Sequence, residues 1–141
     1  MANICDAEVK LEGKDVKAVI KELKETFHVN FIDEAKDNVW IQIDARWNAE
    51  YLNNTLSDLK SHYSFNYEII STEVGNCFAE HYWNVDGEIG SETRDYYEIT
   101  EDNIQDMSSQ DFKQFYGIDF EDLNFEEDDY VQIGNYEFEF L

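Results

Sequence analysis

Residues 4–13, with the sequence ICDAEVKLEG, alternate between small or apolar and charged side chains. This period of two predicts a strand with one buried face and one solvated face. Gly13 ends the strand, and residues 14–27 then follow a helical period with one apolar face. That face carries Val16, Val19, Ile20, Leu23 and Phe27.

The two periods recur in the next part of the chain. A short strand at 29–32, a turn at 34–38 and an alternating strand at 39–45 predict a hairpin. A second amphipathic helix follows at about 48–63. The next strand begins at Phe65, and a bend at 74–76 leads into a further strand that runs to about Val85, where Asp86-Gly87 is typical of a turn.

The order strand–helix–strand–strand–helix–strand predicts an α+β fold of the ferredoxin-like split βαβ type. In this fold an antiparallel sheet carries two helices on one face. We expect the apolar faces of both helices to share one core with the sheet. The expected core residues of the helices are Val16, Ile20, Leu23, Leu52, Leu56 and Leu59.

The last third of the chain is acidic and rich in aromatic residues. We expect a strand at 96–100, a helix at about 104–116 and a strand at 130–140, which either extend the sheet or cover its exposed side. The sequence therefore divides into a ferredoxin-like domain, 1–90, and an acidic extension, 91–141, packed on it. An aromatic content of 16% argues against a disordered tail.

The charge of the chain is strongly negative and unevenly distributed. The 33 acidic and 10 basic residues give a net charge of −23, and no basic residue follows Lys113. Residues 1–75 hold 14 acidic and 8 basic residues, whereas residues 76–141 hold 19 acidic and 2 basic residues. Such a charge repels nucleic acid and anionic membranes, and it attracts basic proteins.

The sequence predicts a cytoplasmic protein. No apolar run approaches the ~20 residues of a membrane span, and the N-terminus has no basic segment followed by an apolar one. The two cysteines, Cys5 and Cys77, are too few for a disulfide framework. We expect both to be reduced thiols in the core.

Two segments resemble a known family. The opening MANIC, the alternating strand that ends at Gly13, and the later segment EVGNCFAE at 73–80 are similar to ferredoxin-like phage and plasmid proteins of the YubB type. Ile4 stands where that family usually has Trp, and Glu80 where it usually has Gly. The resemblance covers about residues 1–90. It implies a ferredoxin-like fold and an origin in a mobile genetic element, and it transfers no site residues.

Nothing in the sequence predicts catalysis. The three histidines, His28, His62 and His81, are too far apart in sequence to form a paired metal-ligand motif. Cys77 and His81 would lie ~13 Å apart on one strand, too far for direct proton transfer. The chain also lacks a phosphate-binding loop and a dinucleotide motif. We therefore predict no enzymatic activity, no cofactor and no metal.

Rows of carboxylates are the candidate binding feature. Glu137 and Glu139 would lie ~6.7 Å apart on one face of the last strand, with aromatic residues anchoring the other face. Duplex DNA presents one phosphate per ~3.4 Å along each strand, so a rigid carboxylate row can replace a phosphate backbone. The predicted partner-binding residues are Asp119, Glu121, Asp122, Glu126, Glu127, Asp128, Asp129, Glu137 and Glu139.

The predicted function is non-enzymatic inhibition of a basic nucleic-acid-binding protein. In this hypothesis the protein mimics nucleic acid and blocks a host defence nuclease, as anti-CRISPR and antirestriction proteins do. The alternatives are an immunity protein that neutralises a basic nuclease toxin, a phage structural or assembly protein, and a charge that only keeps the protein soluble. Each reading predicts that the protein binds neither nucleic acid nor membranes directly.

Overall fold

The computed structural model divides the protein into two compact units, and each is described by itself. The first unit comprises Met1–Arg94 and Tyr136–Leu141, and the second comprises Asp95–Asn135. The expected boundary near residue 90 thus lies close to Arg94, but the end of the chain belongs to the first unit. The structure describes residues 4–34, 38–73, 78–95, 97–99, 107–119, 131–133 and 137–141.

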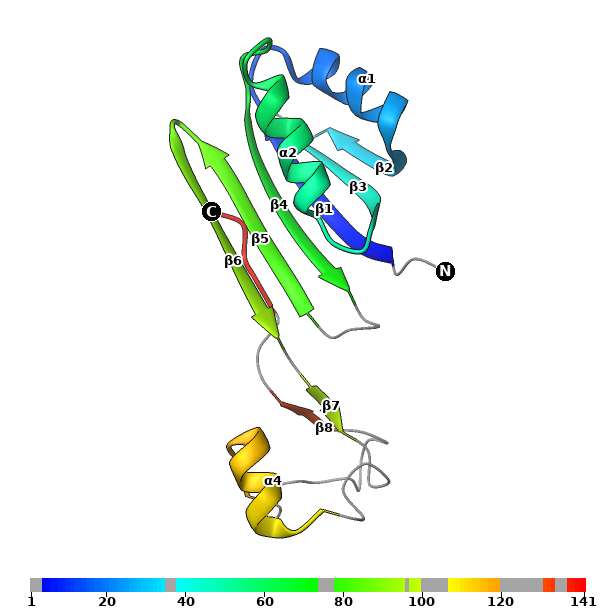
Figure 1. The fold of residues 1–141 in the computed structure, drawn as a ribbon. Coiled ribbons are helices and arrows are strands. Elements are labelled where there is room, and N and C mark those ends of the chain that lie inside the picture. The colour runs from blue at the N-terminus through cyan, green and yellow to red at the C-terminus, as the bar shows by residue number, and fades with distance from the viewer. Residues whose placement is uncertain are drawn as a thin grey trace. The chain divides into compact units, whose positions relative to one another are not determined.

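A six-stranded antiparallel sheet forms the first unit, and two helices cover one of its faces (Figure 1). The strands lie in the order β2-β3-β1-β4-β5-β6. The predicted α+β class is confirmed, but the sheet is larger than a four-stranded ferredoxin-like sheet. The elements are β1 (Ile4–Glu12), α1 (Val16–Thr26), β2 (His28–Glu34), β3 (Val39–Arg46), α2 (Glu50–Leu59), β4 (Asn66–Glu73), β5 (Phe78–Val85) and β6 (Glu88–Asp95).

The opening strand β1 lies between β3 and β4, and its alternating pattern divides its side chains between the two faces of the sheet. Ala7, Val9 and Leu11 are fully buried beneath the helices, whereas Asp6 and Glu8 are exposed on the opposite face. We call this opposite face the open face of the sheet. Antiparallel pairing places Val9 beside Ile41 of β3 and Ile69 of β4, so apolar residues meet across all three strands.

Gly13 allows the sharp change of direction from β1 into α1. Its φ is +136°, in a region that side chains rarely adopt, and an added Cβ would lie 2.8 Å from Phe65 Cα. The helix α1 then ends where Phe27 becomes extended and its N–H bonds to the Leu23 carbonyl at 2.8 Å.

The predicted core is confirmed at five of the helical positions and partly at the sixth. Leu59 is partly buried and packs against the cluster, whereas the other five are buried within it. The buried positions recur at helical spacing on both helices, so each helix presents one apolar face to the sheet. The five buried residues are Val16, Ile20, Leu23, Leu52 and Leu56.

A tight hairpin turn adds β6 to the sheet, a strand that the sequence pattern did not predict. Asp86 and Gly87 have φ values of 50° and 87°. Positive φ at both central residues is typical of a type I′ turn, which matches the twist of paired strands. Asn66 fixes this turn from β4, because its side chain accepts from Asp86 N at 3.1 Å and donates to Asp86 Oδ1 at 3.0 Å.

The second unit contains a helix and a two-stranded ribbon in its described residues. The ribbon pairs β7 (Tyr97–Ile99) with β8 (Val131–Ile133), and the helix is α4 (Ser109–Tyr116). Ser108 caps the helix by accepting a hydrogen bond from Asp111 N at 3.1 Å, and Gly117 ends it in the left-handed conformation. The sequence predicted a helix from about residue 104. Among the described residues, the helix begins at Ser109.

The prediction of a final strand over 130–140 is wrong for the second part of that range. β8 ends at Ile133, and residues 137–141 form no strand. We call Glu137–Leu141 the strap.

Among the described residues, no helix is long and apolar enough to cross a membrane.

Candidate acidic interaction surface

The open face of the sheet carries a row of charged side chains from β1. Asp6, Glu8 and Glu12 are exposed there, with Lys10 between the last two. Asp6 lies opposite Asp44 of β3, so two carboxylates face each other across the strands. Gln42 stabilises this pair, because its Nε2 lies 2.6 Å from Asp6 Oδ1 and 3.0 Å from Asp44 Oδ1.

The amide side chains around Asp44 also set its ionisation. Hydrogen bonds from Gln42 and Asn30 lower the pKa of Asp44, and the nearby His28 lowers it further. These donors stabilise the charged form of the carboxyl group. Asp44 therefore stays ionised at neutral pH.

Two of the cations on the open face, Lys10 and Arg94, make contacts inside the molecule, whereas Arg46 lies opposite Ile4 at the end of β3 and is exposed. Lys10 lies with its Nζ 5.4 Å from the centre of the Trp40 ring. Arg94 lies over the Phe138 ring at 4.1 Å, forms a salt bridge with Glu92 at 3.1 Å, and donates to the Glu137 carbonyl oxygen at 2.6 Å. Both positive charges are thus held by neighbouring groups of the same unit.

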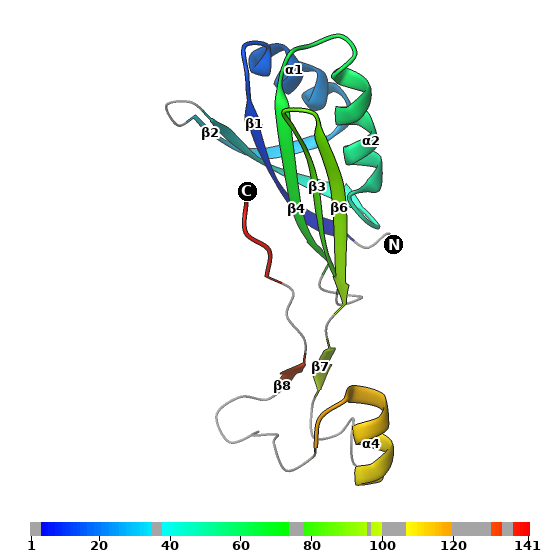
Figure 2. The same ribbon diagram turned by 90° about the vertical axis from the view of Figure 1, so that its left-hand side faces the viewer.

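The strap crosses the open face, on the side of the sheet away from α2 (Figure 2). Phe138 packs on His81, with ring centres 5.3 Å apart, and Phe140 packs edge-on against Trp40 at 4.7 Å. Glu137 and Glu139 are exposed. The predicted alternation of aromatic anchors and outward carboxylates is therefore present, although the strap is not a strand.

A buried polar pair lies beneath the strap. His81 Nε2 and Glu68 Oε2 are 2.7 Å apart, and both side chains are almost fully buried. The backbone N–H of Leu141 donates to the same carboxylate oxygen at 2.7 Å. His81 is thus a core histidine that supports the strap. Cys77, its predicted neighbour, lies outside the described residues.

The structure separates the predicted partner-binding residues. Glu137 and Glu139 lie together on the strap, in the first unit. Asp119 lies in the second unit, where it is exposed and pairs with Lys113 at 3.2 Å. The other six predicted positions, Glu121, Asp122, Glu126, Glu127, Asp128 and Asp129, lie outside the described residues.

Sequence reasoning placed the binding surface at the end of the chain and missed the contribution of β1. Asp6, Glu8 and Glu12 share the open face with the strap. The signal was present, because the alternation over residues 4–12 already placed these carboxylates on the solvated face. Only the return of the strap to the first unit, which has no pattern in the sequence, shows that both rows share one face.

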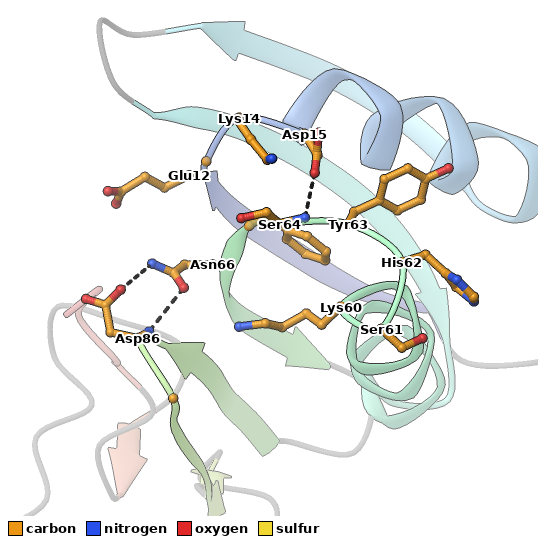
Figure 3. Close-up of a pocket in the computed structure, with 13 residues that line it drawn as sticks. Glu12, Lys14, Asp15, Lys60, Ser61, His62, Tyr63, Ser64, Asn66 and Asp86 are labelled. Carbon is orange, nitrogen blue, oxygen red and sulfur yellow. Dashed lines mark hydrogen bonds between the residues drawn. The ribbon is translucent and has the colours of Figure 1, made fainter.

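A polar pocket of about 660 Å³ lies where three turns meet at one end of the sheet (Figure 3). Its polar groups largely bond to one another. Asp15 accepts from Ser64 N at 2.7 Å, Asn66 bonds to Asp86, and Lys60 extends to Asn84 Oδ1 at 2.9 Å. These hydrogen bonds fix the three turns.

The described residues contain no group of His, Cys, Asp and Glu that could hold a metal ion. Cys5 is free and fully buried. Burial, with the nearby carboxylates of Glu80 and Glu73, raises the pKa of this thiol to about 12. At neutral pH Cys5 is therefore a protonated core thiol and no nucleophile.

Comparison with known proteins gives no relative from which a role could be transferred. No protein-family model matches the chain, and neither the curated proteins nor the solved structures include a significant match.

Proposed function

We propose that this protein is a non-enzymatic inhibitor whose acidic surface occupies the nucleic-acid site of a basic partner protein. The observation that supports it best is the division of charge on the open face. The cations Lys10 and Arg94 contact groups of the same unit, whereas Glu8, Glu12 and Glu139 are exposed. Away from Arg46 at the end of β3, an incoming protein therefore meets carboxylates, which attract Arg and Lys side chains.

The spacing of these carboxylates fits the proposal. Residues on one face of a strand recur every ~6.7 Å, about twice the ~3.4 Å of helix axis that each phosphate of one DNA strand occupies. Asp6 and Glu8 follow this spacing on β1. A twisted sheet holds its side chains rigidly, so the row needs little ordering when it binds, and preorganised surfaces bind more tightly.

We further propose that β1–β4 with α1 and α2 form a ferredoxin-like unit, to which β5 and β6 add two strands. The order β2-β3-β1-β4 with antiparallel neighbours supports this description. The resemblance of residues 1–90 to phage and plasmid proteins favours a mobile element as the source. A host defence nuclease is then the partner we propose, as for anti-CRISPR and antirestriction proteins.

The partner can be identified by capture from a lysate of the native host, with elution by increasing salt and mass spectrometry. Association of the purified partner is then measured with E8Q/E139Q, which removes two charges from the open face and strap. The control is E25Q/D58N, which removes two exposed charges from α1 and α2 on the other face.

We expect E8Q/E139Q to associate more slowly and with a weaker salt dependence, because the charges that steer association are screened over ~8–10 Å at physiological salt. E25Q/D58N should resemble the wild type, and excess DNA should compete with the inhibitor. Equal effects of the two variants would show that the open face is not the contact surface. A partner without a nucleic-acid site would contradict the proposed function.

A further inference from the structure

A strained tryptophan lies in the loop between β3 and α2. Trp47 has a φ of 69°, in the left-handed region, although it is neither Gly nor Asn. A bulky residue in this region is a genuine outlier. Such strain persists only where the surroundings over-determine the backbone, and it is frequent at binding sites.

Three hydrogen bonds hold this loop. The Cys5 thiol donates to the Trp47 carbonyl oxygen at 3.1 Å, and Asn48 N donates to the Arg46 carbonyl oxygen at 2.8 Å. Ala49 N, at the start of α2, donates to the buried carboxylate of Glu80 at 2.7 Å. Two buried polar groups, Cys5 and Glu80, thus fix a loop whose central side chain faces solvent.

The side chains beside Trp47 leave an unusual amount of apolar surface exposed. Trp47 is 58% exposed, Tyr51 63% and Ile4 55%. They line a groove of about 630 Å³ together with Phe27, whose ring centre lies 5.6 Å from that of Tyr51. Contiguous exposed apolar groups of this kind mark interaction sites.

The groove is formally neutral, unlike the acidic chain as a whole, because its charged residues are Arg46 and Asp44. Arg46 is exposed, and it forms no ion pair with the part of the chain that the structure describes. Asp44, the acidic residue of the lining, lies opposite His28 on the neighbouring strand and accepts from Gln42. The guanidinium of Arg46 is therefore open to an incoming carboxylate.

We propose that this groove docks a segment of a partner protein that inserts an apolar side chain between Trp47 and Tyr51 and places a carboxylate on Arg46. Trp, Tyr and Arg are the residues that dominate binding energy at protein interfaces. The groove leaves its aromatic side chains more than half exposed, whereas sites for small molecules bury most of their ligand. This site adjoins the acidic open face, with which it shares Asp44, but its aromatic side chains and Arg46 need a partner segment with an apolar side chain and a carboxylate.

The first test uses capped peptides as probes of the full-length protein, followed by ¹H–¹⁵N spectra. The probes are acetyl-Gly-Asp-Phe-Gly-amide, the same peptide with Asn for Asp, and the same peptide with Ser for Phe. We expect saturable shifts of the Trp47 indole N–H and of the Tyr51 backbone amide with the Asp-Phe peptide. The Asn peptide should bind about three- to five-fold more weakly, the range of one exposed ion pair, and the Ser peptide should not bind.

Three variants complete the test. Trp47→Gly removes the anchor and suits the positive φ, so it keeps the fold and should abolish the shift of the Tyr51 backbone amide. Arg46→Gln should bring the Asp peptide down to the affinity of the Asn peptide. Ile89→Ser, which removes a 75% exposed apolar side chain from β6, is the matched control and should leave binding unchanged.

The proposal is overturned if the Asp-Phe peptide causes no saturable shift at Trp47, or if Trp47→Gly binds it as the wild type does. It is also overturned if the wild type dimerises in solution and Trp47→Gly is monomeric, because the occupant is then a second copy of this chain. Neither result bears on the acidic surface, which E8Q/E139Q tests separately.

Discussion

At the scale of single residues, Leu56 is the clearest test of the core. Its side chain is fully buried between α2 and the sheet. Leu56→Ala removes buried methyl groups and leaves a cavity, so it should lower the free energy of unfolding by about 2–5 kcal/mol. Urea unfolding followed by circular dichroism measures this loss. Leu59→Ala, at a partly buried position, should cost less, and equal losses would contradict the packing.

The buried Cys5 and the partly buried Tyr82 predict how stability changes at high pH. Burial raises the pKa of Cys5 to about 12, and burial with the nearby Glu80 raises the pKa of Tyr82 to about 12. In the unfolded chain both groups release their protons at lower pH, near 9 for the thiol and 10 for the phenol. The unfolded state therefore binds fewer protons in this range, and stability should fall as pH rises from about 9 to 12.

Substitution can separate these two contributions. Cys5→Ala should remove the part of the decline that begins near pH 9, and Tyr82→Phe the part that begins near pH 10. Urea unfolding at a series of pH values measures both. A Cys5→Ala variant whose stability falls as steeply as that of the wild type would show that the thiol is ionised in the folded protein.

At the scale of elements, the strap depends on Arg94. This side chain contacts the Phe138 ring and donates to the Glu137 carbonyl. Arg94→Ala should destabilise the strap by about 1–2 kcal/mol, the sum of one exposed cation–π contact and one hydrogen bond. Amide exchange of Leu141, whose N–H donates to Glu68, reports the opening of the strap.

Two controls sharpen this prediction. Arg94→Lys keeps the charge but loses the planar fork, so it should recover only part of the protection. Lys24→Ala removes an exposed cation from the end of α1 and should leave Leu141 unchanged. Unchanged exchange in Arg94→Ala would mean that aromatic packing alone holds the strap.

The elements that the sequence predicts well are those whose side chains divide cleanly between core and solvent. β1 alternates strictly, and both helices of the first unit carry apolar residues at helical spacing. β6 has no such division, because Glu88, Ile89 and Glu92 are all exposed. Its place in the sheet comes from the Asp86-Gly87 turn, so no pattern in the strand itself could reveal it.

The strap shows the same limit at the candidate site. Its alternation predicted aromatic anchors and outward carboxylates, and this is how Phe138, Phe140, Glu137 and Glu139 are arranged. The alternation also predicted a strand, which is wrong, because side-chain contacts and one N–H to Glu68 hold the strap. No pattern in the sequence predicted the strained backbone of Trp47 either, because hydrogen bonds to residues distant in sequence hold this loop.

At the scale of the whole molecule, the charge should oppose folding. A net charge of −23 on 141 residues creates self-repulsion that is largest in the compact state. Salt shortens the screening length from ~10 Å at 0.1 M to ~3 Å at 1 M, so the midpoint of thermal unfolding should rise with sodium chloride concentration. Calorimetry measures it. A midpoint that is independent of salt would mean that bound cations already neutralise the surface.

The division into two units leads to a last prediction, that the first unit folds without the second. Every buried residue of its core cluster lies within the range from Ala7 to Ile69. Asp95–Asn135 therefore adds nothing to that cluster. The ends to be joined are also close, because Arg94 Nη1 lies 2.6 Å from the Glu137 carbonyl oxygen. A Gly/Ser linker of about six residues in place of 95–135 therefore has enough reach.

This variant should unfold cooperatively and keep the slow exchange of Leu141. It loses 13 acidic residues and one basic residue, which leaves a net charge of −11. If the open face and strap contact the partner, the variant should still bind it, with slower association because less charge steers the encounter. A folded variant that no longer binds would place the contact in the second unit, whereas one that binds at the wild-type rate would show that the charge of 95–135 takes no part.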